Sequence, residues 1–396
     1  MNEKTIKVVF VRYTKDLNSA SFNRYIGIVK ATATNFNTIS VSNRPTINKN
    51  THTENELFSK INVNHYYTKK DTRTNNFFRK SLDLIIGNIY ALSLIKSLNK
   101  KEYSKVVVIL YSTNFIDLFL FIFFKLILNY RLVTERNEYP LHIRKKVSAI
   151  NYFINYALFY LLYKGFDGII LMTEPLISFY KKYLKSSCIV VKIPMTVDID
   201  RFSNVNQKDK SSIEKNITYV GSLSQEKDGI DHLITAFTNI INIRKDLKLI
   251  IIGGDKEEIE KKRTLTKGFE SDIIFMGKVD RELIPKYLYN SYILVLPRPN
   301  SKQAEGGFPT KLGEYLSTGI PTLLTNVGEN SKYVKDNTHV FLVEPNNPKA
   351  YADKLDWILE NYSQAKKIAM NGKMYIKENH SLAVEGKKLY NFLGNI

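Results

Sequence analysis

The sequence predicts an α/β protein made of two consecutive units, each built on a parallel sheet. The chain has 396 residues, about twice the length of a typical single domain. Short apolar runs rich in Val and Ile recur along it with helical patterns between them, which is typical of parallel sheets covered on both faces. A polar stretch without periodicity, residues 194–212, separates two sets of such runs.

The apolar runs predict the strands in chain order. The first sheet is expected to contain 6–11, 105–111, 130–135, 168–173 and 189–194. The second is expected to contain 216–221, 247–254, 272–277, 292–297, 321–325 and 339–344. Residues 115–130 and 150–163 are apolar on almost every side, and we expect them to be helices buried against the first sheet rather than presented to lipid. Neither is expected to span a bilayer, which needs ~20 apolar residues.

Charge is spread unevenly along the chain. The net charge is +20, and residues 1–195 hold 29 Lys and Arg against 12 Asp and Glu. This excess predicts an anionic partner of the first unit, which could be a membrane surface, a phosphorylated acceptor or nucleic acid, although a merely solvated Lys-rich surface would also account for it. Because basic residues lie beside apolar segments, we expect peripheral association with a membrane. These basic residues are at 69–70, 73, 79–80, 144–146, 181, 182 and 185.

Cysteine and histidine are scarce. The single Cys188 excludes an internal disulfide and fits a reducing, cytoplasmic setting, and residues 1–11 lead straight into a strand without a visible secretory signal. With 6 His and one Cys, no cluster has the spacing of a metal site, so neither a metal nor a cofactor is expected.

Three motifs directly follow predicted strands of the second sheet, where open parallel sheets bind ligands. In "YVGSLSQEKDG" (219–229), Lys227 stands just before an expected helix start at 228–229 and suits a phosphate. In "IIGGD" (251–255), paired glycines would let a ligand approach the main chain, although a tight turn would also explain them.

The third motif is "AEGGFPTKLGEYLSTGIPTLLT" (304–325). Pro309 fits the first turn of a helix and Thr310 can cap it, which leaves the amides of 307–311 free for an anion. Glu314 lies one turn beyond Thr310, where its carboxylate can accept hydrogen bonds from sugar hydroxyls. An ordinary capped helix would not explain the paired glycines at 306–307.

These motifs together resemble the group 1 family of retaining glycosyltransferases with the GT-B fold, especially bacterial members that build surface polysaccharides. The resemblance rests on the segments 194–202, 219–237, 247–255 and 294–325. It implies two Rossmann-like domains that face each other across a cleft. Residues 1–195 would bind the acceptor, residues 196–378 would bind the nucleotide sugar, and a helix at 379–396 would pack back on the first domain.

The resemblance also implies roles for individual residues. Lys227 would contact the donor diphosphate, Glu314 the ribose, and the amides near 278–279 the nucleobase, while Glu135, Arg136 and Glu138 would face the reacting sugar. The donor would be a substrate, and no metal would be needed. The expected donor-binding set is Gly221, Ser222, Lys227, Gly253, Lys278, Val279, Arg298, Glu305, Gly306, Gly307, Phe308, Pro309, Thr310, Lys311 and Glu314.

The chain departs from the family pattern at two of these positions. Glu305 lies one residue out of register with the first family glutamate, whose position is taken by Gly306. Ser222 stands where an Arg is common, which leaves Lys227, with Lys311 or Arg298, to balance the phosphates. The acceptor is expected to be lipid-linked or a polysaccharide.

Two other functions stay open on the sequence. A GT-B-fold epimerase that acts on the nucleotide sugar would use Glu135 and Glu138 as acid and base. A basic membrane-binding or nucleic-acid-binding protein with a decayed site would explain the charge, but no RNA-binding module or recognition helix is visible, so no nucleic-acid partner is expected.

Overall fold

The chain forms two compact units. The first comprises Met1–Pro194 with Glu385–Ile396, and the second comprises Met195–Val384. The computed structural model describes residues 5–13, 17, 19–44, 48–67, 77–98, 102–140, 143, 148–203 and 215–396. The basic residues at 69–70, 73 and 144–146, and residues 204–212 of the expected linker, lie outside this range.

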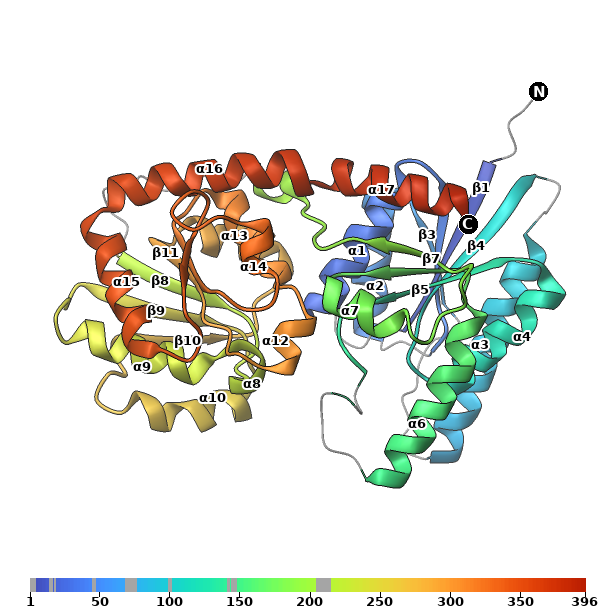
Figure 1. Ribbon diagram of the computed structural model, residues 1–396, viewed down its shortest axis with the longest axis horizontal. Coiled ribbons are helices and arrows are strands. Elements are labelled where there is room, and N and C mark those ends of the chain that lie inside the picture. The colour runs from blue at the N-terminus through green and yellow to red at the C-terminus, as the bar shows by residue number, and fades with distance from the viewer. Residues whose placement is uncertain are drawn as a thin grey trace. The chain divides into compact units, whose positions relative to one another are not determined.

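The first unit is built on a seven-stranded parallel sheet (Figure 1). Its strands follow the order β3-β2-β1-β4-β5-β6-β7, and in the central pairs Val9 of β1 lies opposite Ile39 of β2 and Val108 of β4. Val9 and Val108 are fully buried, as continuous apolar strands between two helical layers require. The strands are β1 (Thr5–Arg12), β2 (Asn37–Ser42), β3 (Asn64–Tyr67), β4 (Tyr103–Tyr111), β5 (Arg131–Arg136), β6 (Gly168–Leu171) and β7 (Ile189–Lys192).

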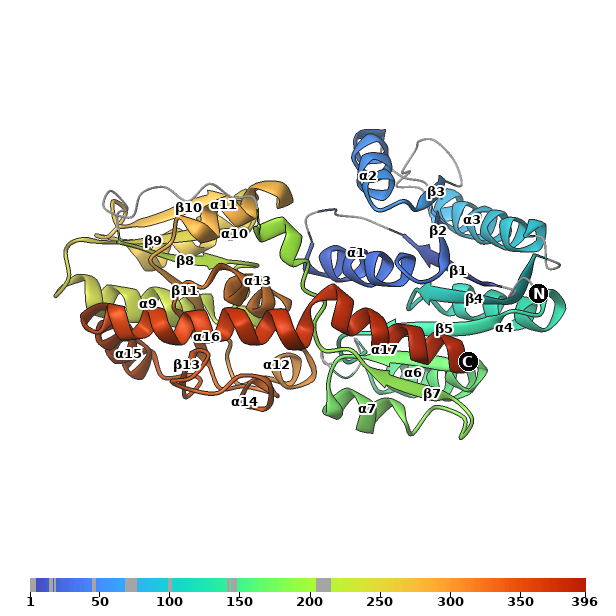
Figure 2. The ribbon, with the colours of Figure 1, turned by 90° about the horizontal axis from the view of Figure 1, so that it is seen from above.

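Helices cover the first sheet, and side-chain caps fix where several of them begin. Ser19, Asn114, Ser148 and Thr173 each accept a hydrogen bond from a backbone amide of the first turn that follows. The last helix also belongs here, because Lys105 Nζ donates to the carbonyls of Leu393 and Gly394 at 3.0 and 2.8 Å (Figure 2). The helices are α1 (Ala20–Ala33), α2 (Asn48–Lys60), α3 (Phe77–Ser97), α4 (Phe115–Leu128), α6 (Ala149–Leu162), α7 (Glu174–Tyr180) and α17 (Leu382–Asn395).

The second unit is built on a six-stranded parallel sheet with the order β10-β9-β8-β11-β12-β13. Its strands are β8 (Lys215–Val220), β9 (Leu247–Ile252), β10 (Ile273–Gly277), β11 (Ile293–Leu296), β12 (Thr322–Thr325) and β13 (Phe341–Val343). Its helices are α8 (Gln225–Asp228), α9 (Ile230–Ile241), α10 (Lys256–Arg263), α11 (Ile284–Tyr289), α12 (Lys302–Gly306), α13 (Thr310–Thr318), α14 (Asn330–Tyr333), α15 (Pro348–Glu360) and α16 (Tyr362–His380).

The predicted fold class is confirmed: the chain is an α/β protein with two Rossmann-like parallel sheets. Every strand predicted from an apolar run is present. Strands β2 and β3 of the first sheet were not predicted, because "NTISVS" and "NHYY" lack a continuous apolar run. The roles assigned to the two parts of the chain stay predictions.

The expectation that the two most apolar segments are buried against the sheet is wrong for one side of each. Helix α4 buries Leu118 and Phe121, but Leu126 on its other side is 83% exposed. On helix α6, Ile150 is 73% exposed and Phe153 is 71% exposed. No helix within the described residues is long and apolar enough to cross a bilayer.

Candidate functional site

The turns after β8 and β9 lie against each other at the carboxyl edge of the second sheet. Gly221 N donates to Ile252 O at 2.8 Å, and Gly253 N donates to Gly277 O at 2.7 Å. Gly253 has a φ of +125°, and a Cβ there would lie 1.8 Å from Gly221 O. Gly253 is therefore required by this backbone contact and by its positive φ, and its contact with a ligand stays a prediction.

A half-buried lysine, Lys311, enters the site from the first turn of α13. Lys311 Nζ lies 3.4 Å from Asp228 Oδ1 and 3.5 Å from the Tyr219 hydroxyl, and it sits over the Tyr219 ring at 5.1 Å from the centroid. Gly221 leaves the space for it, since a Cβ there would lie 2.0 Å from Nζ. Ser222 Oγ donates a short hydrogen bond to Asp228. The connections that follow β8 and β11 thus meet at one ammonium group.

Arg298 follows β11 and forms hydrogen bonds to two neighbouring segments of the chain. Its guanidinium is buried and donates to Lys227 O at 3.3 Å and to Gly307 O at 3.1 Å. It thereby joins α8 to the loop in front of α13. Lys227 lies inside the one-turn helix α8, which Ser224 caps, rather than before a helix start as expected. The helix that follows begins at Ile230.

Positive charge exceeds negative charge in this cluster. Burial lowers the pKa of the Lys311 ammonium; Asp228 opposes this, while Lys227 and Arg298 add to it by repulsion. Burial disfavours the charged form of Asp228, but Lys311, the Ser222 hydroxyl, Arg298 and Lys227 together hold the pKa of that carboxyl below its ordinary value. Three cations therefore share one carboxylate, and a bound anion would relieve their repulsion. We call Lys227, Asp228, Arg298 and Lys311 the cationic cluster.

The start of α13 differs in detail from the expectation. Pro309 is the residue before the helix rather than its first residue, and Thr310 is the first helical residue, without a capping side chain. Gly306 ends a short additional helix, α12, which Ser301 caps. Phe308 is buried against Tyr333, with ring centroids 4.9 Å apart. The first amides of α13 remain suited to an anion, since they lack partners within the helix.

Glu314 is paired within the second unit. Its Oε1 accepts from Arg201 Nη1 at 2.7 Å, and Arg201 also donates to Arg281 O at 2.8 Å. Arg201 was not predicted as a site residue from the sequence, although it lies in the segment 194–202 that contributes to the family resemblance. Glu305 lies on α12 and pairs with Lys302 at 2.7 Å, with 43% of its side chain exposed. Contact of either glutamate with a sugar stays a prediction.

The predicted nucleobase edge follows β10. Lys278 is exposed and Val279 is half-buried. Lys278 and Gly277 line a cavity of about 440 Å³ together with residues of β10 and α10, among them Phe275 and Ile259. The cavity offers apolar and aromatic surface beside the carboxyl ends of β9 and β10. A role in base binding stays a prediction.

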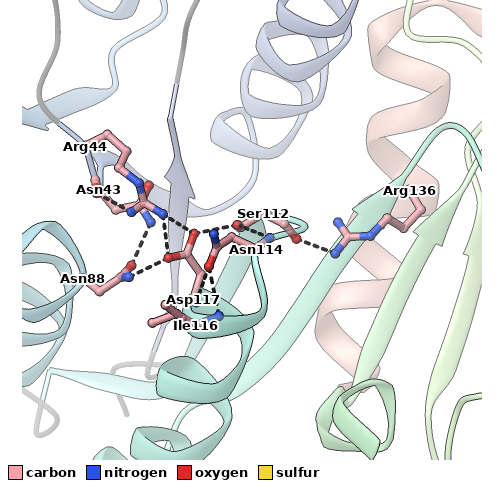
Figure 3. Close-up of polar contacts among 8 residues, drawn as sticks. All are labelled: Asn43, Arg44, Asn88, Ser112, Asn114, Ile116, Asp117 and Arg136. Carbon is pink, nitrogen blue, oxygen red and sulfur yellow. Dashed lines mark hydrogen bonds and ion pairs between the residues drawn. The ribbon is translucent and has the colours of Figure 1, made fainter. Parts of the chain in front are cut away.

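The charged residues proposed to face the sugar lie at the end of β5 in the first unit. Glu135 is buried and forms a short ion pair with Arg24, which also donates to Ile193 O at 2.7 Å. Arg136 is buried too and donates to the Tyr163 hydroxyl at 2.6 Å. It also donates to Ser112 O at 2.5 Å (Figure 3). Both side chains are engaged inside the unit, which favours support of the sheet edge over direct contact with a substrate.

Glu138 is half-buried, and its carbonyl accepts from the Tyr180 hydroxyl at 3.2 Å.

Of the predicted donor-site residues, the structure brings together Gly221, Ser222, Lys227, Arg298, Gly307 and Lys311. Glu305 is instead paired with Lys302. Among the described residues, no three His, Cys, Asp or Glu side chains come together in a way that could hold a metal ion.

Comparison with known sequences finds a family model that is similar to part of the second unit. Residues 200–375 match the sequence model of glycosyl transferases group 1. An uncharacterized glycosyltransferase of Methanocaldococcus jannaschii is 27% identical over 169 residues, 42% of each chain. The capsular polysaccharide biosynthesis glycosyltransferase CapM of Staphylococcus aureus is 26% identical over 185 residues, 44% of this chain and 45% of its own. The aligned part thus spans less than half the length of either relative.

Comparison with solved structures supports the fold over the whole chain. The chain is similar to the Anabaena protein Alr3699/HepE, crystallised in complex with UDP, with a TM-score of 0.72 and 13% identity. The alignment covers 98% of this chain and 100% of that one. At this identity the likeness shows the fold, which is the GT-B class.

Proposed function

We propose, from the match of residues 200–375 to the group 1 glycosyltransferases, that the protein transfers a sugar from a nucleotide-sugar donor to an acceptor in cell-surface glycan biosynthesis. The observation that carries the proposal is the cationic cluster. It lies at the carboxyl edge of the sheet in the segment that matches the family, and three cations around Asp228 suit a diphosphate.

The donor would occupy the second unit. Lys227 and Lys311 would bind the diphosphate, helped by the amides at the start of α13, and Glu314 would accept from the ribose. Arg298 would act chiefly by holding α8 and Gly307 in place. Lys278 and Val279 would border the nucleobase. UDP in the crystal of the similar Anabaena protein supports a nucleotide in this fold.

The reaction would retain the configuration of the sugar and would need no metal. As the bond from the anomeric carbon to the donor phosphate oxygen breaks, the acceptor hydroxyl would attack from the same face. Its proton would pass to an oxygen of the departing diphosphate, whose charge Lys227, Lys311 and the helix amides would stabilise. The products would be the glycosylated acceptor and a nucleoside diphosphate.

The acceptor is proposed to be lipid-linked or a polysaccharide, bound by the first unit at the cytoplasmic face of a membrane. The positive charge of residues 1–195 and the capsular-polysaccharide relative support this. The epimerase alternative is disfavoured, because the Glu135 carboxylate is buried and held by Arg24 inside the first unit.

The test is incubation with a panel of sugar nucleotides, with and without a membrane lipid extract, while nucleoside diphosphate release is measured. Lys227→Ala and Glu314→Ala should each reduce turnover by the equivalent of ~2–4 kcal/mol. Lys261→Ala is the matched control, since Lys261 is an exposed lysine on α10. Near-wild-type turnover in both site variants would refute the assignment, and acceptor-independent epimerisation would favour the alternative.

A further inference from the structure

Helices α3, α4 and α6 of the first unit form one layer whose outer surface is apolar. Helix α4 contacts both α3 and α6, so their outer sides adjoin (Figure 1). On α3 the exposed large apolar residues are Leu82, Ile85, Ile86 and Ile89, whose spacing places them on one side of the helix.

The other two helices continue this surface with larger side chains. Phe119, Phe123 and Leu126 are exposed on α4. Ile150, Phe153 and Leu161 are exposed on α6. A soluble surface normally carries such residues singly, whereas a contiguous set on three neighbouring helices indicates a surface that meets an apolar partner. We call this set the apolar face.

The charged residues of α4 point the opposite way, into the protein. Asp117 is buried and accepts from Arg44 Nη2 at 2.7 and 2.6 Å, from Asn88 of α3 at 2.6 Å and from Ser112 at 2.6 Å (Figure 3). Lys125 donates to Asp167 at 2.7 Å. The usual arrangement of a surface helix is inverted here, since its polar side chains are bound inside and its outer side is apolar.

The positive charge of the first unit favours an anionic lipid partner over a second copy of the chain. Residues 1–195 hold 29 Lys and Arg against 12 Asp and Glu. The segments of α4 and α6 contain no Asp or Glu except the buried Asp117. Two copies facing each other would bring like charges together, whereas an anionic lipid surface would attract this unit.

Aromatic residues along α6, and a basic residue just beyond it, fit the boundary between lipid tails and headgroups. Tyr152, Tyr156 and Tyr160 are exposed on α6, and Tyr is favoured where one end of a side chain is apolar and the other wet. Lys164 Nζ lies 4.0 Å from the centroid of the Tyr160 ring, in a position to reach headgroups.

We propose that the protein docks on an anionic lipid bilayer through the apolar face of α3, α4 and α6, with these side chains inserted at the level of the headgroups. The inference deepens the membrane partner proposed above by naming its surface. It does not depend on the donor site. A lipid-linked acceptor would thereby reach the same unit that is proposed to bind it.

The experiment measures co-sedimentation of the full chain with vesicles of phosphatidylglycerol and phosphatidylcholine at low salt. The variant Leu126→Ser with Phe153→Ser removes two exposed side chains of the apolar face. The matched control is Ile243→Ser, because Ile243 is 76% exposed but lies in the second unit. Circular dichroism and thermal melting check that each variant folds.

We expect the wild-type chain and Ile243→Ser to bind the mixed vesicles, with weaker binding to phosphatidylcholine alone. The double variant should bind at least about tenfold less tightly, because each substitution removes most of an apolar side chain that would insert. Its nucleoside diphosphate release without vesicles should equal that of the wild type. This readout separates failure of docking from failure of the proposed reaction.

Three results would overturn the proposal. The first is absence of wild-type binding to the anionic vesicles, and the second is equal binding by the double variant. The third is a wild-type dimer in sedimentation velocity that the double variant converts to a monomer, since the face would then join two copies.

Discussion

At the scale of single residues, we expect Lys311 to determine how pH acts on donor binding. Burial lowers the pKa of its ammonium, and a diphosphate binds the charged form. We expect affinity for a nucleoside diphosphate to fall as pH rises through this lowered pKa, below the ordinary lysine range. Lys311→Arg should retain affinity to higher pH, because a guanidinium stays charged. Calorimetric titrations between about pH 7 and pH 10 check this, and parallel pH profiles for the two proteins would count against it.

Arg201 is a positioning residue for Glu314. Its guanidinium donates to the Glu314 carboxylate at 2.7 Å and to Arg281 O at 2.8 Å, which fixes the direction of that carboxylate. We expect Arg201→Ala to raise the donor KM roughly tenfold, the loss of about one charged hydrogen bond, with a smaller change in kcat.

A double-mutant cycle tests whether Arg201 acts through Glu314. The double variant Arg201→Ala with Glu314→Ala should have the same kcat/KM as Glu314→Ala alone. Once the Glu314 carboxylate is removed, Arg201 has nothing left to orient. Additive losses would mean that Arg201 acts on the donor by another route.

At the scale of elements, the contact between the turns after β8 and β9 is a requirement for stability. A Cβ at residue 253 would overlap Gly221 O, and the φ of Gly253 is +125°. We expect Gly253→Ala to lower the free energy of unfolding by about 3 kcal/mol. Gly268 is the matched control, since its φ is +83° but nothing lies within 4 Å of a Cβ there. Gly268→Ala should cost only about 1 kcal/mol, and equal losses in denaturant unfolding would contradict the steric account.

The strands could be predicted from the sequence where burial on both faces leaves a continuous apolar run. Strand β9, "LKLIII", carries this signal, whereas the edge strand β3, "NHYY", is only half-buried and does not. The outward side of α4 could not be predicted, because apolar residues do not reveal whether sheet or lipid faces them. Asp117 was the available signal, since a buried carboxylate needs partners on the inner side.

The candidate site, like the fold, could be predicted from the sequence only in part. Lys227, Lys311 and Arg298 follow strands that end at one edge, so the topology brings them together. The pairing of Glu314 with Arg201 was not predictable, because it joins residues 113 positions apart in the sequence. The capping residue of α13 was expected to be Thr310 and is Pro309, since proline is tolerated both before and at the first helical position.

At the scale of the whole molecule, the proposed reaction depends on protein cations for charge. We propose that Lys227 and Lys311, with Arg298 close to them, balance the charge of the diphosphate. We therefore expect turnover of the active sugar nucleotide to persist after exhaustive chelation, with no gain when Mg²⁺ or Mn²⁺ is restored. Loss of turnover with chelator, reversed by either ion, would contradict the metal-free reaction.

The central claim is that the cationic cluster binds the diphosphate of a nucleotide sugar. Calorimetric titration of the wild-type chain with a panel of nucleoside diphosphates tests it most directly. We predict that at least one binds, that Lys227→Met with Lys311→Met weakens its Kd by at least about tenfold, and that the exposed control Lys261→Met leaves the Kd unchanged. Binding of the same nucleotide with equal affinity by the double variant would contradict the claim.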